Sequence, residues 1–301
     1  MEQLGPIAGL AAAACWAIAS VFYTRVPLGA GAMTTFKNSL AAVCLFAALL
    51  VARAVTREPI FQATWSAVWD VSISGVIGLC LADIAYFRSI QILGARRGIT
   101  LTLLTPPTTA ILGHFWLNDH LTLTTGICIV VTIAGIAIVM RERSEPTADQ
   151  KIRPGSTRWG VICALLGIGT MSIGAVLLKR GTSGVGALEA TFLRLLAASV
   201  FGALVSWPRG EFGEIRTLLA NRTGTRHLCT ATILGTVIGV YLMLVAYKYC
   251  TTGTAATLTS TTPLFVIPVA YVAYKQTITG AAILGALVAF GGVCGLIAAS
   301  Q

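Results

Sequence analysis

The sequence predicts an all-α integral membrane protein with ten transmembrane helices in two inverted five-helix repeats. Three observations carry this prediction: the composition, the spacing of the apolar runs and an ordered repeat between the two halves. Of the 301 residues, 56% are hydrophobic and only 11% are charged, and the mean hydropathy is +0.83. A soluble domain carries roughly 25% charged residues to cover its surface. This composition therefore fits lipid as the solvent.

The apolar runs have the length of membrane spans. A helix needs about 20 mostly apolar residues to cross a bilayer, and each run must be helical because lipid offers no partners for backbone polar groups. A charged linker at 141–158 divides the chain into a first repeat, 1–140, and a second repeat, 159–301. The expected spans are 4–24, 32–52, 70–91, 98–117, 121–140, 159–178, 187–207, 228–249, 253–274 and 278–299.

The two halves share an ordered set of matches. Segments 100–106 and 257–263 both read T-L-T-x-x-T-P. Upstream, residues 85–86 match 246–247, and residues 35–36 match 191–192. Five spans per half is an odd number, so the second half must insert upside down relative to the first. Inverted repeats of this kind are common in secondary transporters, whose site lies near mid-membrane where the repeats meet.

Charge and motif content exclude several classes of function. The net charge is +10, but the basic residues fall mainly between the apolar runs, where they fix helix ends and topology. We therefore expect no nucleic-acid partner. The eight cysteines form no C-x-x-C pair, which argues against a metal or disulfide framework. The sequence has no Walker A loop, H-E-x-x-H or G-x-S-x-G nucleophile turn. We expect no enzyme activity and no cofactor, with a proton gradient as the candidate energy source.

The chain resembles the drug/metabolite transporter superfamily, and within it the EamA-type ten-helix permeases. The resemblance rests on two five-helix units, on Pro106 and Pro263 in the fourth helix of each, and on the acidic turn at Asp119. It also rests on Phe192 and Arg194 near the start of a second helix. At the acidic turn the family usually has glutamate.

The resemblance implies a secondary transporter that moves a small metabolite by alternating access. An amino acid or a similar polar or amphipathic solute, moved by export through the plasma membrane, is the expected activity of a monomer or homodimer. The resemblance implies cytoplasmic termini, whereas the distribution of basic residues predicts external termini. We prefer the cytoplasmic placement and leave the orientation open.

Polar side chains inside the spans are the candidate transport residues. Asp83 costs on the order of 3 kcal/mol at a helix centre, so it needs a wet cavity or a partner. It can couple protons, contact a substrate amine or pair with Lys37 to orient helices. Lys37 can instead snorkel to the headgroups. Arg194 favours a carboxylate, either of the substrate or of Glu189 or Asp83.

Prolines inside the fourth and ninth spans free backbone carbonyls, and the neighbouring threonine hydroxyls can satisfy those carbonyls or bind a solute. A histidine in the fourth span can titrate near neutral pH. The expected substrate-binding or coupling residues are Trp16, Lys37, Asn38, Asp83, Tyr86, Thr102, Thr105, Pro106, His114, Arg194, Tyr247, Thr259, Thr262 and Pro263.

Two other functions stay open at this point. The first is an integral-membrane enzyme acting on a lipid-linked substrate. It would carry a cluster of acids or histidines at one interface, for which Asp119 and His120 give the only hint. The second is a lipid flippase or an assembly subunit of the same fold, which a cavity that opens sideways to lipid would favour.

Overall fold

The computed structural model describes residues 3–23, 25–26, 28–57, 63–93, 101–142, 156–265, 268–269 and 280–299, and its regular elements are all helices. The first half contains α1 (Leu4–Tyr23), α2 (Ala30–Thr56), α3 (Trp65–Gly75), the π-helical η1 (Val76–Leu81), α4 (Ala82–Leu93), α6 (Thr105–Leu117) and α7 (Leu123–Glu142). Helices α3, η1 and α4 form one continuous rod. The linker between 143 and 155 lies outside the described residues.

The second half repeats this order with one addition. It contains α8 (Thr157–Gly181), the 3-10 turn η2 (Thr182–Gly184), α9 (Ala187–Ser206), α10 (Glu211–Leu219), α11 (Arg222–Ala231), the π-helical η3 (Thr232–Ile238), α12 (Gly239–Tyr249), α13 (Thr252–Thr259) and α15 (Gly280–Ala299). Each half thus has a π-helical segment in its third span. The sequence did not predict α10, and α11 begins earlier than the expected span at 228–249.

The all-helical membrane fold with two related halves is confirmed. Within the described residues, six helical rods are long and apolar enough to cross a membrane, and the segments Leu123–Ile138 and Ile283–Ala299 add two shorter apolar helices. The fourth and ninth spans are broken rather than kinked. Pro106 lies in the first turn of α6, where the missing N–H of proline is harmless. The helical turn 262–265 places Pro263 in the same way.

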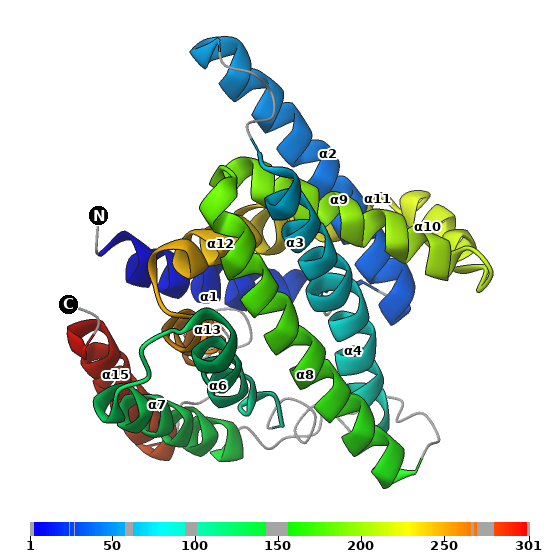
Figure 1. Cartoon of the computed structure of the whole chain (residues 1–301). Helices are drawn as coiled ribbons and strands as arrows, with labels where there is room; N and C mark the ends of the chain where they lie inside the picture. Colours follow the sequence, from blue (N-terminus) through cyan, green and yellow to red (C-terminus); the bar gives the residue numbers. More distant parts are fainter. Residues whose placement is uncertain are drawn as a thin grey trace.

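Helices from the two halves pack against each other throughout the molecule. In Figure 1, α8 runs beside α4, and α7 lies beside α15. Helix α2 packs along α9 in antiparallel fashion, and the phenyl rings of Phe46 and Phe192 lie 5.3 Å apart between their centroids. Helices η1 and α8 approach each other closely. A Cβ atom on Gly174 would lie 2.7 Å from the Cα atom of Gly78, so only glycine fits there.

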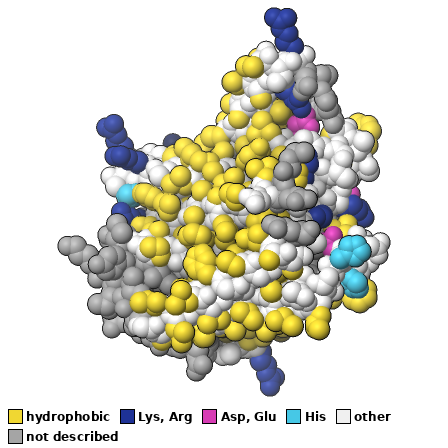
Figure 2. Space-filling model, turned by 90° about the vertical axis from the view of Figure 1, so that its left-hand side faces the viewer, with side chains coloured by type: hydrophobic (Ala, Val, Ile, Leu, Met, Phe, Trp, Pro, Cys, Tyr) yellow, Lys and Arg dark blue, Asp and Glu magenta, His cyan; other side chains and the backbone are white. Residues whose placement is uncertain are grey.

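The outer surface matches a lipid environment. Figure 2 shows apolar side chains spread across one face, with lysine and arginine near its margins. Exposed tryptophans lie at both ends of the spans. Trp65 and Trp116 mark one end, and Trp159 and Trp207 mark the other. Tryptophan is enriched at the two membrane–water interfaces, so these side chains delimit the membrane-embedded part.

Candidate functional site

An ion pair inside the membrane-embedded part forms the centre of the site. The ammonium of Lys37 on α2 lies 2.9 Å from a carboxylate oxygen of Asp83 on α4, and the two side chains are only 13% and 18% exposed. Asp83 lies in the first turn of α4, two residues after the end of η1. The pairing considered from the sequence is therefore present in the structure. Whether Asp83 also couples protons stays a prediction.

Asn38 and Arg194 occupy equivalent positions on the second helix of each half, and both are buried. Asn38 is fully buried, and its Oδ1 accepts a hydrogen bond from Lys37 at 3.4 Å. Its Nδ2 has no partner among the described residues. Arg194 is 3% exposed, and its Nε and Nη1 also lack partners within the described part of the chain. Both repeats thus place an unsatisfied donor at the same point of their scaffold.

Two repeat-equivalent tyrosines flank these charged groups. Tyr86 lies within electrostatic range of Asp83, and Tyr247 lies within electrostatic range of Arg194. Arg194 also interacts electrostatically with Asp83. We call this group of six residues the charged cluster. It consists of Lys37, Asn38, Asp83, Tyr86, Arg194 and Tyr247, all of which were sequence candidates.

The hydroxyls around the proline breaks are divided between two roles. Thr259 donates to the carbonyl of Ala255 at 2.9 Å, and Thr262 donates to the carbonyl of Thr259 at 3.0 Å. These hydroxyls satisfy backbone carbonyls of the broken ninth span. Thr105, by contrast, is buried and its hydroxyl has no partner among the described residues. Thr102 is half-buried in the turn before α6.

Two further sequence candidates lie away from the charged cluster. The indole of Trp16 donates to the carbonyl of Gly235 inside η3 at 2.8 Å, which fastens α1 to that segment. His114 is exposed near the end of α6, and its Nδ1 lies 3.0 Å from the carbonyl oxygen of Asp119. Neither contact excludes a role in transport, which stays a prediction for both residues.

The acidic turn has a clear structural task. One carboxylate oxygen of Asp119 accepts hydrogen bonds from the backbone nitrogen and the hydroxyl of Thr252, at 2.7 and 2.8 Å. Asp119 therefore satisfies free donors at the start of α13 and ties the first half to the second. The hint of an interfacial acid cluster, which favoured an enzyme, is explained by this cap.

Sequence reasoning missed two ion pairs between the halves. Arg180 on α8 donates to Asp70 on α3 through two nitrogens, with Nε 2.6 Å from Oδ2. Arg53 on α2 binds the buried carboxylate of Glu189 on α9. With the Asp119 cap, these pairs lie at the same end of the spans, the end where α1 begins and α15 stops. Their partners lie far apart in sequence, so no local pattern indicates the pairing.

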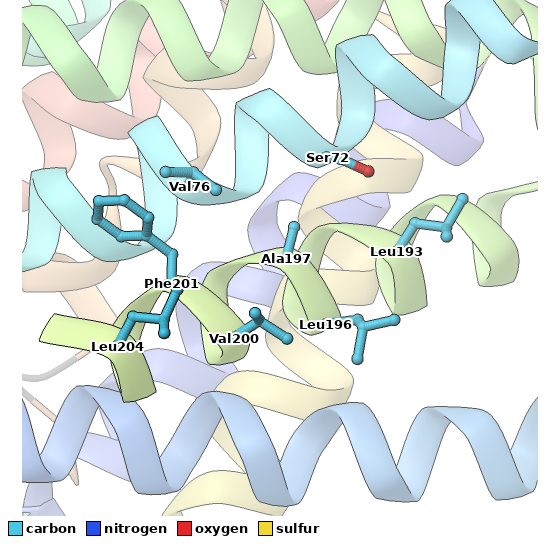
Figure 3. Close-up of a pocket in the computed structure, with 8 residues that line it drawn as sticks. All are labelled: Ser72, Val76, Leu193, Leu196, Ala197, Val200, Phe201 and Leu204. Atoms are coloured by element: carbon cyan, nitrogen blue, oxygen red, sulfur yellow. The ribbon is translucent and has the colours of Figure 1, made fainter. Parts of the chain in front are cut away.

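An apolar groove of about 400 Å³ lies on the outside of the molecule, between the α3–η1 rod and α9 (Figure 3). Its α9 wall includes Leu196, Val200 and Leu204, which are exposed. Ser72 contributes the single hydroxyl among the residues that line it. The groove therefore faces lipid and is separate from the charged cluster.

Charged and polar groups buried between two related helical halves are typical of membrane transport proteins. The sequence model of the EamA-like transporter family matches residues 3–141 and 158–298. The chain therefore belongs to this family of transporters, whose members are not enzymes. No curated protein matches the chain. One solved structure, a crystal structure of a protein, aligns over 97% of this chain and 95% of its own chain, with a TM-score of 0.74 and 16% identity. At that identity the likeness shows a shared fold.

Proposed function

We propose that this protein exports a small polar or amphipathic metabolite, such as an amino acid, across the plasma membrane by alternating access between its two halves. The observation that supports the proposal most directly is the charged cluster. Ionisable groups inside membrane spans are expensive and are retained mostly on substrate or ion pathways. Here the Lys37–Asp83 pair and Arg194 lie where helices of both halves meet.

Proton coupling through Asp83 gives this arrangement a mechanism. When Asp83 takes up a proton, its carboxylate loses its charge and the attraction to Lys37 is lost. That attraction joins α2 to α4, so protonation loosens a contact between two spans of the first half. Release of the proton on the other side restores the contact. The chain carries no ATP-binding loop, so an ion or solute gradient must drive uphill movement.

Reconstituted liposomes test the proposal. Purified protein is incorporated into vesicles loaded with a mixture of labelled L-amino acids, and efflux is followed with and without an imposed proton gradient. The wild type should release at least one solute faster than empty liposomes and should respond to the gradient. Asp83→Asn should still exchange solute for solute but lose the response to the gradient.

Glu214→Gln is the matched control, because Glu214 lies on α10 outside the charged cluster. Its carboxylate accepts a hydrogen bond from the backbone nitrogen of Gly29 at 2.9 Å, and glutamine keeps an oxygen that can accept this bond. The Glu214→Gln protein should behave as the wild type. Gradient-driven efflux that persists in a well-folded Asp83→Asn protein would contradict the coupling role. Efflux no faster than from empty liposomes, for every solute in the mixture, would contradict transport of this solute class.

A further inference from the structure

Arg194 is a buried cation whose hydrogen-bonding capacity is largely unused. The side chain is 3% exposed, and Nε and Nη1 have no partner among the described residues. A guanidinium carries five N–H donors in a fixed fork. Leaving such donors unsatisfied inside a protein costs more than an ordinary hydrogen bond gains. The sequence therefore retains a costly group that the described protein residues do not satisfy.

Two carboxylates that could pair with Arg194, those of Asp83 and Glu189, form ion pairs with other residues. Asp83 is within electrostatic range of Arg194 but forms its ion pair with Lys37. Glu189, one turn earlier on α9, is paired with Arg53. The carboxylate within electrostatic range of Arg194 and the carboxylate five residues earlier on α9 thus both pair with other bases. The charged cluster itself contains two cations and one anion, so it is one negative charge short of balance.

The local packing leaves room for the guanidinium. A Cβ atom on Gly78 would lie 3.0 Å from Nη2 of Arg194, and a Cβ atom on Gly75 would lie 2.1 Å from the carbonyl oxygen of Arg194. The absence of both side chains lets the α3–η1 rod approach α9 closely and gives the fork its place. The packing therefore holds the Arg194 guanidinium in place, but no neighbouring group in the described part of the chain neutralises its positive charge.

We propose that the transported solute carries an oxyanion, a carboxylate or a phosphate, and that Arg194 binds this group. This inference rests on the proposed transport function and names the substrate class for the same site. An oxyanion supplies both the missing negative charge and the acceptors for the free donors, and arginine binds planar oxyanions through two parallel hydrogen bonds.

Asn38 supplies a second donor for a different part of the solute. Its Oδ1 is taken by Lys37, so only Nδ2 is free to bind. Along the antiparallel α2–α9 pair, Thr35 lies against Ser206 and Phe46 against Phe192. Asn38 is therefore displaced along the helix axes from the level of Arg194 by roughly 10 Å at a rise of about 1.5 Å per residue. The two donors do not share one oxygen.

Thermal unfolding of the purified protein, followed by tryptophan fluorescence, tests the binding of oxyanions directly. The probes are sodium formate, sodium acetate and inorganic phosphate, each compared with sodium chloride at equal ionic strength. At about ten times its dissociation constant, a bound probe should raise the wild-type melting temperature by about 3 °C. Formate and acetate acting without phosphate indicate a carboxylate solute, and the reverse indicates a phosphate.

Arg194→Gln should show none of this rise, whereas Arg216→Gln, which removes an exposed arginine on α10, should retain it. A wild type that responds to no oxyanion, or an Arg194→Gln protein that responds equally, would overturn the inference. Arg194→Met gives a readout without any ligand. It should melt at or above the wild-type temperature, and a fall of several degrees would show that the guanidinium is paired after all.

These outcomes separate the substrate class from the transport function. Solute efflux from liposomes that is equal in the wild type and in Arg194→Gln leaves transport intact and removes the oxyanion site. Oxyanion-dependent stabilisation without efflux of any solute leaves the site intact and removes the proposed transport.

Discussion

The two members of the Lys37–Asp83 pair should differ in how much stability they carry. Asp83→Asn removes the one carboxylate of the charged cluster and leaves the Lys37 ammonium without its partner. Lys37→Met leaves the Asp83 carboxylate within range of a guanidinium whose Nε and Nη1 are unpartnered among the described residues. The positive charge of Arg194 can compensate in part for the loss of the Lys37 charge beside Asp83. We therefore expect Asp83→Asn to be the more damaging change.

The magnitude follows from the burial of the pair. Removing one partner of a fully buried ion pair costs about 3–5 kcal/mol. The Lys37 and Asp83 side chains are 13% and 18% exposed, so residual solvation reduces this cost. We expect Asp83→Asn to lower the free energy of unfolding by about 2–3 kcal/mol. That corresponds to a melting temperature lower by roughly 5–10 °C. Lys37→Met should cost about half as much.

Thermal unfolding in detergent, with tryptophan fluorescence as the signal, measures both changes and the double variant. The double variant should be less destabilised than the sum of the single changes, because it leaves neither charge without its partner. Lys248→Met, at the end of α12, controls for the loss of a lysine. The reasoning is refuted if Lys37→Met is as damaging as Asp83→Asn, or if the two effects add.

Three other predictions use different parts of the molecule. Asp119→Ala removes the carboxylate that accepts hydrogen bonds from Thr252 at the start of α13 and should lower stability by about 1–2 kcal/mol, while Asp119→Asn keeps an acceptor and should lose less. A melting curve that is unchanged in Asp119→Ala would contradict the capping role. Gly174→Ala should lower the yield of folded protein, since its Cβ would clash with η1, whereas Gly169→Ala on the same helix meets nothing within 4 Å and should not. Equal yields by size-exclusion chromatography would count against this contact. Thr102→Trp should slow solute efflux from liposomes if the broken fourth span lines the path, while Val130→Trp on the exposed face of α7 should not. Normal efflux with Thr102→Trp would place the path elsewhere.

The sequence predicted the class of fold well because membrane proteins obey a strong constraint. Length and hydropathy place the spans, and an odd number of spans per half determines the inversion. The cost of burying charge also identified Asp83 and Arg194, and the repeat pointed to Tyr86 and Tyr247. These signals are local or arise from comparing one half with the other, so they need no knowledge of which helices adjoin.

The contacts between helices could not be predicted from local sequence patterns or from the repeat. Asp70 binds Arg180 because α3 packs on α8, and neither residue marks its partner in the sequence. Helix α10 was missed for a different reason. It has nine residues, with Ile215 and Leu218 buried on one side and glutamates in its first turn. That pattern is too short and too polar for a search based on the length of membrane spans.

The π-helical turn before Asp83 gives this carboxylate a second way to change partners. In η1 the N–H of Ala82 donates to the carbonyl of Ile77, five residues back, so the turn holds one residue more than an α-helical turn. If the π-helical turn shifted along the helix past Asp83, the Asp83 side chain would rotate by about 100° around the helix axis. The backbone hydrogen bonds on both sides of the turn would stay intact. The carboxylate would leave Lys37 without any tilt of the rod. At the equivalent segment of the other half, the indole of Trp16 donates a hydrogen bond to the carbonyl of Gly235 within η3. The same migration there would have to break this hydrogen bond. The two π-helical segments are thus held differently: η3 by a hydrogen bond from an indole, and η1 by the close glycine contact of Gly78 with Gly174 on α8.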